Sequence, residues 1–226
     1  MKHSVLVIGI GRFGAATARE LMRLGHDVLA VDQSEAVVSD IAPDVTHALQ
    51  VDATDIEALK TIGAGDFEHA IVAISGHAEP SIFATMALKQ LGVSNVVAKA
   101  GTALHGSILE RVGADRVVYP EREMGARVAH LFAYPNVLDY IDVAPGFGLV
   151  MLRPPESFHG RTIGELELSQ KTQLSPIALR RGERVIVNPH RDERIAPGDQ
   201  LILIGRDAGL AKLEEPPGGA DRPGGR

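Results

Sequence analysis

The stretch Gly9-Ile10-Gly11-Arg12-Phe13-Gly14 has the residue types and spacing to bind the phosphates of a nucleotide. It follows an apolar strand-like run and precedes a helical pattern, which is the context that makes a GxGxxG sequence informative. The first glycine permits a sharp turn, the second lets the backbone approach the phosphates, and the third lets helix and strand pack closely. The helix N-terminus then faces the anion. The predicted phosphate contacts are Gly9, Gly11, Arg12, Phe13 and Gly14.

Two charged side chains extend this prediction. Arg12 places a guanidinium inside the turn and favours a ligand with highly charged phosphates, although a surface arginine without a ligand is the alternative. Asp32 ends the second apolar run about twenty residues later, where a carboxylate can accept hydrogen bonds from ribose hydroxyls. A helix N-cap is the other interpretation of Asp32, and Ser34 could provide that cap equally well.

Later strand ends supply further candidates, because ligands of open α/β sheets bind outside the carboxyl ends of the strands. Asp52 could reach an adenine amino group or cap the next helix. Lys99 ends a buried run, a position that is unfavourable unless its ammonium meets an anion or water. His105 is either a second polar contact or an ordinary loop histidine. These ends contribute Asp52, Ala53, Ile74, Ser75, Gly76, Lys99, Ala100, Gly101 and His105.

The elements that position these residues occupy residues 1–135. Short runs rich in valine, isoleucine and leucine alternate with helical segments, which predicts a parallel sheet covered on both faces. Right-handed crossovers give an α/β, doubly wound, Rossmann-like domain. In the first helix we expect one apolar stripe of Phe13, Ala16, Thr17, Leu21 and Leu24. The predicted strands are Ser4–Gly9, Asp27–Asp32, His47–Asp52, Ala70–Ser75, Asn95–Ala100 and Arg116–Pro120.

Residues 136–214 differ in pattern and predict a smaller α+β domain. Arg181-Gly182-Glu183 is typical of a hairpin turn, and Ala196-Pro197-Gly198-Asp199 of a tight turn before the last strand. Residues 215–226 are proline, glycine and charge, and we expect a disordered tail. The predicted strands are Leu138–Val143, Phe147–Leu152, Leu174–Arg180, Arg184–Val187 and Leu201–Gly205, with short helices near Ile163–Leu168 and Ala208–Leu213.

Composition restricts the function classes. The 226 residues are 45% hydrophobic and 23% charged, as in ordinary globular proteins, and there is no cysteine for thiolate chemistry. A net charge of −6 with 4% aromatic residues argues against nucleic-acid binding. The beginning of the sequence has no signal-peptide pattern, so we expect a cytoplasmic protein. Because the HExxH, GxSxG and Walker patterns are absent, the sequence favours a ligand sensor over an enzyme.

Several segments resemble the KtrA/KtrC family, cytoplasmic regulatory subunits of potassium uptake systems that have RCK (regulator of potassium conductance) domains, also called TrkA-N and TrkA-C. The resemblance covers nearly the whole chain before the tail. It rests on the glycine-rich turn, on Val31-Asp32, on Gly113-Ala114-Asp115-Arg116-Val117-Val118, on Pro120-Glu121-Arg122-Glu123-Met124-Gly125 and on Pro135-Asn136-Val137-Leu138-Asp139-Tyr140-Ile141.

The resemblance implies a homo-octameric ring, built from dimers, beneath a membrane potassium channel subunit of the KtrB or TrkH type. The protein would then be peripheral at the inner face of the cell membrane. ATP and ADP would bind the N-terminal domains and hold the ring in different shapes. By position, Asp32, Gln33 and Ser34 would hold the ribose, and the strand ends above would complete the pocket.

The resemblance also assigns a metal and a second messenger. Glu121 would hold Mg²⁺ or Ca²⁺ together with the ATP γ-phosphate, whereas its position alone suggests a first-turn helix acid. A helical stripe of Met124, Val128, Leu131 and Phe132 would transmit the change or simply pack in a core. Cyclic di-AMP could bind the C-terminal domain, for which a plain dimer core is the alternative. The groove residues would be Ile163, Ala178, Arg180, Val187, Asn188 and Pro189.

Three alternatives remain open at this level. The ligand could be NAD(H) in a Trk-type regulator, since the residue types at the turn do not exclude it. An NAD-dependent oxidoreductase would show cofactor turnover. A redox-sensing repressor would bind DNA, but the sequence contains no helix-turn-helix pattern.

Overall fold

The computed structural model describes residues 2–214, and the predicted tail at 215–226 lies outside them. The chain divides into two compact units, one ending at Glu121 and the other beginning at Arg122. This division precedes the predicted boundary at 135/136, because the helix that follows Glu121 packs against the second unit: Leu131 and Tyr134 contact that unit's core. The two units are described separately below.

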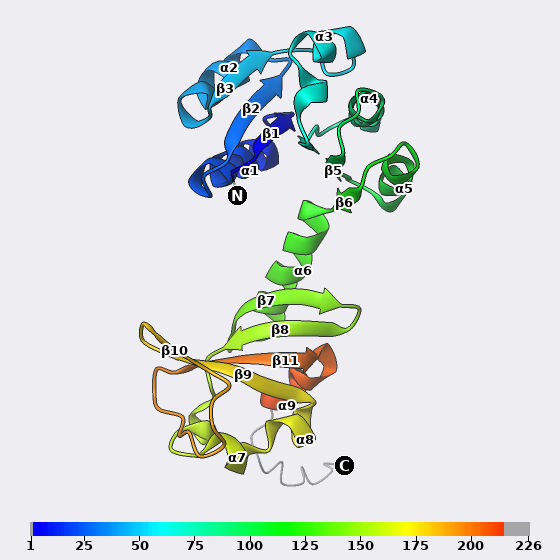
Figure 1. The fold of residues 1–226 in the computed structure, drawn as a ribbon. Helices are drawn as coiled ribbons and strands as arrows, with labels where there is room; N and C mark the ends of the chain where they lie inside the picture. The colour runs from blue at the N-terminus through cyan, green and yellow to red at the C-terminus, as the bar shows by residue number, and fades with distance from the viewer. Residues whose placement is uncertain (1, 215–226) are drawn as a thin grey trace. The chain divides into compact units, whose positions relative to one another are not determined.

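The first unit is built on a six-stranded sheet with strand order β3-β2-β1-β4-β5-β6 (Figure 1). All neighbouring strands are parallel, with Val5 opposite Val28 on one side and His69 on the other. The order reverses between β1 and β4, which is the switch point where doubly wound folds bind ligands. The predicted α/β Rossmann-like fold is therefore confirmed. The strands are β1 (Ser4–Ile8), β2 (Asp27–Asp32), β3 (His47–Gln50), β4 (His69–Val72), β5 (Asn95–Lys99) and β6 (Arg116–Val118).

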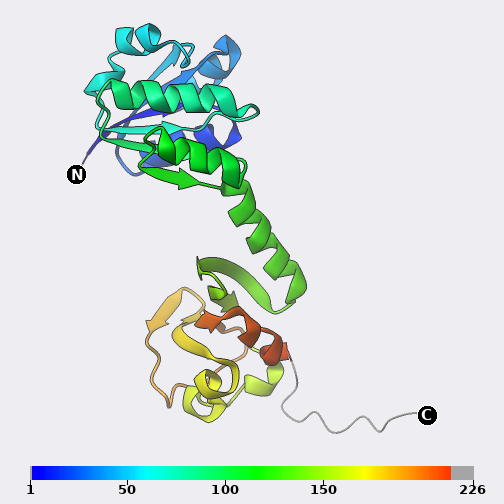
Figure 2. The same cartoon turned by 90° about the vertical axis from the view of Figure 1, so that its right-hand side faces the viewer.

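Helices cover both faces of this sheet. On one face α1 and α2 pack over Val5, Val7 and Ala30. On the other face lie α3, α4 and α5, the last two in front of the strands in Figure 2. The helices are α1 (Arg12–Arg23), α2 (Glu35–Ile41), α3 (Ile56–Thr61), α4 (Ala78–Gln90) and α5 (Ala103–Arg111), with 3-10 turns η1 (Ala42–Asp44) and η2 (Ala64–Asp66).

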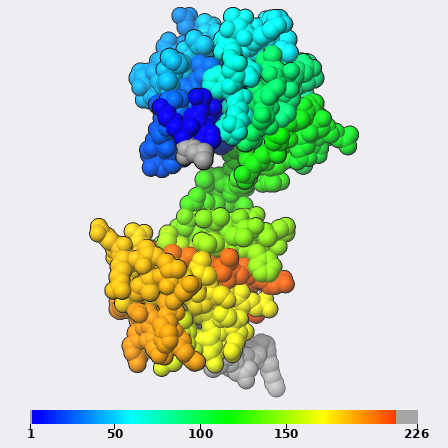
Figure 3. All heavy atoms as spheres, in the orientation of Figure 1, coloured from blue at the N-terminus to red at the C-terminus, as the bar shows by residue number. Residues whose placement is uncertain are grey.

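The second unit is built on an antiparallel sheet with strand order β10-β9-β11-β8-β7. Its edge strand β10 lies in the orange segment seen at the surface of this unit in Figure 3. The predicted smaller α+β domain is confirmed. The elements are α6 (Pro120–Ala133), β7 (Val137–Ala144), β8 (Phe147–Leu152), η3 (Glu156–Phe158), α7 (Ile163–Leu166), α8 (Leu168–Thr172), β9 (Leu174–Arg181), β10 (Arg184–Val187), β11 (Gln200–Arg206), η4 (Asp207–Gly209) and α9 (Ala211–Glu214).

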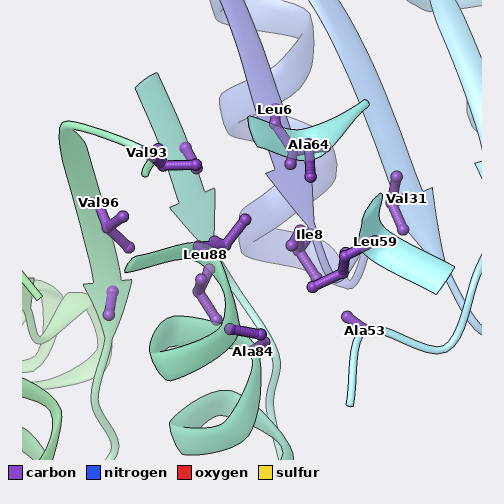
Figure 4. Close-up of a cluster of buried hydrophobic side chains, with 14 of the residues drawn as sticks. Leu6, Ile8, Val31, Ala53, Leu59, Ala64, Ala84, Leu88, Val93 and Val96 are labelled. Atoms are coloured by element: carbon purple, nitrogen blue, oxygen red, sulfur yellow. The ribbon is translucent and has the colours of Figure 1, made fainter. Parts of the chain in front are cut away.

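Each unit has its own apolar core. In the first, the side chains of β1 and β2 meet those of α3 and α4 around Ile8, Leu59 and Leu88 (Figure 4). In the second, Leu179, Leu201 and Leu203 are fully buried beneath the helices. Within residues 2–214, none of the helices has the length and apolar character needed to span a bilayer.

The stripe predicted for the first helix is wrong. In α1 the buried residues are Gly14 and Ala18, whereas Ala16 and Leu24 are exposed. The reason is the close approach of α1 to β1, which only small side chains allow. Apolar periodicity therefore identified the helix but not the face that it buries.

Candidate functional site

The glycine-rich turn lies between β1 and α1 at the carboxyl end of the sheet. Gly9 has φ +87°, and a Cβ there would lie 2.8 Å from the backbone nitrogen of Ile74. A Cβ on Gly14 would overlap the carbonyl oxygen of Gly9. Both glycines are therefore required by the turn itself. Gly11 is different, because within residues 2–214 no heavy atom lies within 4 Å of the position that its Cβ would take.

Gly11 is also the N-cap of α1. No side chain of the described residues caps this helix, and its first turn contains no acidic residue. The first backbone amides of a helix have no intrahelical acceptor, and the helix dipole adds partial positive charge there. The open space at Gly11 and the uncapped amides together leave room for an anion.

Asp32, at the end of β2, is tied to two turns at once. Its Oδ2 accepts a hydrogen bond from the amide of Ile10 at 2.7 Å, and its Oδ1 accepts one from the amide of Ser34 at 2.9 Å. The carboxylate thus fixes the glycine-rich turn and the start of α2. A carboxylate oxygen has two acceptor positions, so each oxygen keeps one for a further donor.

A cavity of about 420 Å³ opens beside these residues, across the carboxyl ends of β1, β2 and β4. Its volume lies within the range of about 300–1,000 Å³ that is common for small-molecule sites. Pro80 and Thr54 belong to its wall and were missed by the sequence analysis, which considered only strand ends and the glycine turn. The lining is Ile8, Gly9, Gly11, Asp32, Gln33, Val51, Asp52, Ala53, Thr54, Ala73, Ile74, Ser75 and Pro80.

Asp52 has a local structural role on this wall. Its Oδ1 accepts hydrogen bonds from the Thr54 hydroxyl at 2.7 Å and from the Thr54 amide at 2.9 Å. These bonds hold the pKa of the Asp52 carboxyl below its ordinary value. The N-cap of α3 is Asp55, whose carboxylate accepts hydrogen bonds from the amides of Glu57 and Ala58. Asp52 therefore shapes the turn before α3, and its Oδ2 is the oxygen without a printed partner among the described residues.

A second cavity of about 290 Å³ adjoins the first, and both are lined by Ile74 and Ser75. Lys99, 7% exposed, lies on its wall. The Lys99 ammonium donates to Glu121 Oε1 at 2.6 Å and to the Ser75 hydroxyl at 3.0 Å. The predicted need of Lys99 for an anion is met by Glu121. The lining is Ile74, Ser75, Gly76, His77, Ala78, Lys99, Gly101, Thr102, His105 and Glu121.

Glu121 is the charged counterpart at this cavity. The hydrogen bond from Lys99 holds the pKa of the Glu121 carboxyl below its ordinary value, and the positive charge of Arg12 lowers it further. Arg12, though exposed, is thus close enough to act on the same site. The ring centroid of Phe13 lies 5.8 Å from the Lys99 ammonium nitrogen. The site combines two cations with one carboxylate.

His105 is half-buried rather than an ordinary loop residue. Its Nε2 lies 2.8 Å from the hydroxyl of Ser81, and its Nδ1 accepts a hydrogen bond from the Gly101 amide at 3.4 Å. Burial lowers the pKa of the imidazole. With Nδ1 as acceptor, Nε2 is the nitrogen with the proton, and it donates to the fully buried Ser81. His105 therefore joins α4 to α5.

Most predicted site residues are brought together at these two cavities. Gly14 and Ala100 are buried behind them, and neither is part of a cavity wall. Ser34 provides its backbone amide to Asp32. In the second unit the predicted groove is not formed as expected, since Ile163 and Ala178 are buried, whereas Val187 on the edge strand β10 is 70% exposed.

The donor sets fit the two predicted ligands differently. The uncapped helix N-terminus, the open side of Gly11 and Arg12 suit a nucleotide phosphate. A divalent cation at Glu121 Oε1 would meet the Lys99 ammonium already bound there. A metal at Glu121 is therefore compatible with this site only after that ion pair opens.

Comparison with known families and relatives gives a consistent result. The TrkA-N domain family matches residues 5–120, and the TrkA-C domain family matches residues 149–218. Ktr system potassium uptake protein C of Bacillus subtilis (strain 168) is 37% identical over 215 residues, which cover 95% of this chain and 97% of the relative. Ktr system potassium uptake protein A of Vibrio alginolyticus is 32% identical over 205 residues, covering 91% and 93%.

Solved structures show the same fold. The GsuK channel superposes with a TM-score of 0.66 at 21% identity over 95% of this chain, and the GsuK channel bound to NAD with 0.65. The chain corresponds to 39% of each of those channel chains. The crystal structure of the GsuK RCK domain, of which the chain spans 49%, gives a TM-score of 0.64. At this identity the similarity establishes the RCK fold.

Proposed function

The chain belongs to the family of TrkA-N and TrkA-C domain proteins that includes the Ktr potassium uptake proteins, and we propose that it is a nucleotide-sensing regulatory subunit of a Ktr- or Trk-type potassium transport system. It binds ATP or ADP at the carboxyl ends of β1, β2 and β4. The bound nucleotide selects the shape of a subunit ring that acts on a membrane channel subunit from the cytoplasmic side. The protein is not an enzyme.

The observation that supports nucleotide binding is the corner at Gly11. An uncapped helix N-terminus, open space beside Gly11 and the adjoining cavity of about 420 Å³ occur together there. The phosphates approach the amides of α1, and the adenosine part occupies the cavity. Asp32 has one free acceptor position on each oxygen for the two ribose hydroxyls.

Charge favours ATP or ADP over a ligand with fewer phosphate charges. Arg12 is exposed at the beginning of α1, and Lys99 is a second cation at the adjoining cavity. A guanidinium forms a bidentate, charge-assisted pair with phosphate oxygens, and an ammonium adds a compact charge. Because Lys99 is already paired with Glu121, a third phosphate competes with that carboxylate for the ammonium.

Calorimetric titration of the full chain with ATP, ADP, NAD and NADH tests the ligand. We expect ATP and ADP to bind more tightly than NAD or NADH. The variant Arg12→Ala should weaken ATP binding by about tenfold, since one charge-assisted interaction is lost. The matched control is Arg19→Ala on the same helix, where Arg19 pairs with Asp44 at 2.7 Å and not with the site. Unchanged ATP affinity in Arg12→Ala would remove Arg12 from the site.

The metal proposal follows from the Lys99–Glu121 pair. With ATP, Lys99 turns to the phosphates and Glu121 is released to hold Mg²⁺ or Ca²⁺, for which carboxylate oxygens are suitable ligands. Glu121→Gln should abolish the enhancement of ATP binding by divalent cations and leave ADP binding intact. An equal loss for both nucleotides would contradict the γ-phosphate bridge and indicate that the variant damages the site itself.

Ring formation requires surfaces for other copies of the chain. On α6 the apolar side chains of Met124, Val128 and Phe132 are 52%, 55% and 90% exposed. On β7, Ile141 and Val143 are also more than half exposed. Such unpaired apolar surface supports a homo-octamer built from dimers. A nucleotide changes the ring only if it binds one shape more tightly than the other.

NAD(H) is the second candidate ligand. Asp32 at the end of β2 stands where a carboxylate holds the ribose of NAD in Rossmann domains, and the GsuK channel was solved bound to NAD. NADH binding far tighter than ATP would favour a Trk-type NAD(H) regulator, and substrate-dependent turnover of NADH would indicate an oxidoreductase. Cyclic di-AMP at the second unit is tested in the same titration series, with Arg180→Ala as its variant.

A further inference from the structure

Histidines gather at the end of the parallel sheet opposite to the nucleotide site. His3 precedes β1, His26 precedes β2 and His69 begins β4, and these three strands are neighbours in the sheet. The rings of His3 and His69 are 4.9 Å apart between centroids and nearly perpendicular. Glu68, next to His69, brings a carboxylate oxygen to 3.8 Å from His69 Nε2. The proposed function uses none of these residues.

We propose that His3, Glu68 and His69 form a binding site for a zinc-type divalent cation. One donor atom from each of the three side chains lies within 4.8 Å of the others. A tetrahedral ion with bonds of about 2.1 Å needs donors roughly 3.4 Å apart, so the side chains close by about 1.4 Å at most. Two imidazoles and one carboxylate are a common zinc donor set, in which water completes the coordination.

The two imidazoles are positioned by residues of the neighbouring strands. The backbone amide of His3 donates to His26 Nδ1 at 3.2 Å, and its carbonyl accepts from the Asp27 amide at 2.9 Å. His69 Nδ1 lies 3.2 Å from the side-chain nitrogen of Asn95. Rotation of that amide would present its oxygen to a protonated Nδ1 and leave Nε2 unprotonated for the metal. Such outer hydrogen bonds fix the ring and its tautomer at metal sites.

Exposure is suited to binding an ion from solution. The Glu68 side chain is 69% exposed and can turn toward the histidines, whereas the His69 side chain, 27% exposed, is held by the sheet. The beginning of the chain, dark blue in Figure 3, lies at the surface of the first unit. Imidazole ligands select zinc-type ions over Mg²⁺ and Ca²⁺, which prefer oxygen ligands. The bound ion links β1 to β4 and stabilises the first unit by mass action.

The direct test is calorimetric titration of the full chain with Zn²⁺, without nucleotide or histidine tag and after treatment with a chelator. We expect one zinc ion per chain and a rise in the melting temperature of the first unit. Both His69→Ala and Glu68→Gln should weaken zinc binding by about tenfold or more, and Asn95→Ala by a similar or smaller factor. Mg²⁺ should not compete.

The matched control is His190→Ala in the second unit. His190 also lies beside a carboxylate, with Nδ1 3.3 Å from Asp192 Oδ2, and both side chains are more than three-quarters exposed. Among the described residues this pair has no third ligand grouped with it, so zinc binding should be unchanged. If His69→Ala fails to fold, the exposed Glu68→Gln decides the question.

Two results would overturn the site. One is a wild-type protein that takes up no zinc. The other is equal zinc binding by wild type, His69→Ala and Glu68→Gln, or an equal loss in His190→Ala. Nucleotide binding at the opposite end of the sheet is measured separately, so the failure of one proposal leaves the other standing.

Discussion

The two units of this protein use their sheets in different ways. In the first, a parallel sheet is buried on both faces, and its carboxyl edge is open, polar and lined by cavities of about 420 and 290 Å³. In the second, the cavities found among the described residues measure about 120 and 10 Å³, but large apolar side chains such as Phe132 and Val187 are exposed. A parallel sheet ends all its strands at one edge and can gather ligand contacts there. The antiparallel unit has surface for association instead.

The largest effect should come from Gly14→Ala, which would remove the ligand-binding corner of the first unit. The new Cβ overlaps the backbone oxygen of Gly9, which cannot move away as a flexible side chain could. We expect a loss of about 3 kcal/mol or more in the stability of the first unit, measured by thermal unfolding.

The matched control for this glycine is Gly11→Ala, because its Cβ meets open space and its φ of −67° suits any residue. Stability should change by no more than about 1 kcal/mol, whereas ATP affinity should fall. Equal unfolding of both variants would show that the corner is not divided into a packing glycine and a ligand-facing glycine.

In the second unit, the largest effect should come from Arg181→Met. Arg181 makes two hydrogen bonds of 2.8 Å to the carboxylate of Asp199, which is 1% exposed. Removing the guanidinium leaves a buried carboxylate without its cation, at an expected loss of about 3 kcal/mol in the unfolding free energy. Nucleotide affinity of the first unit should not change.

Arg180→Met is the control for that variant, since the Arg180 side chain hydrogen-bonds only a turn carbonyl, that of Gly182. Urea unfolding that is equally affected in both variants would mean that the buried ion pair is not what stabilises the unit.

A smaller effect is expected from Phe132→Ser, which tests association by the second unit. Phe132 is 90% exposed, so folding should be preserved while self-association weakens by about tenfold, or about 1.4 kcal/mol. Analytical ultracentrifugation measures this. Leu104→Ser provides the contrast, because Leu104 on α5 of the first unit is 73% exposed but is not part of the α6 stripe. Equal weakening by both would erase the distinction between the units.

The smallest effect should be a pH dependence of the first unit through His105. Burial lowers the pKa of His105 in the folded protein, so below the ordinary value of about 6.5 the unfolded chain binds the proton more readily. This contribution to stability is complete above that value and is lost progressively as the pH falls toward the folded pKa. Between about pH 7.5 and about pH 5.5 the melting temperature should fall less in His105→Asn than in wild type. Parallel curves would contradict this assignment.

Much of the fold could be predicted because local patterns determine it. Every strand of the first unit was predicted within a few residues, since buried parallel strands are near-continuous apolar runs. The helix predicted at Ile163–Leu168 was less accurate: Glu167, with φ +49°, separates α7 from α8, and no sequence signal indicated that break.

The site was predicted unevenly. Strand ends and glycines could be identified because their place in the fold follows from chain order. The partner of Lys99 could not, since the sequence required an anion but left its identity to tertiary contacts. The joining of Asp32 to both Ile10 and Ser34 likewise depends on two turns meeting at one edge.

The sequence by itself determined the doubly wound fold, the position of the glycine-rich corner and the change to a second, smaller domain. It did so because glycine spacing and apolar periodicity act over a few residues. Only the tertiary structure decided that Lys99 meets Glu121, that α1 buries small residues, and that His3 lies beside His69. Those contacts join residues distant in sequence, and they depend on strand order and register, which no local pattern specifies.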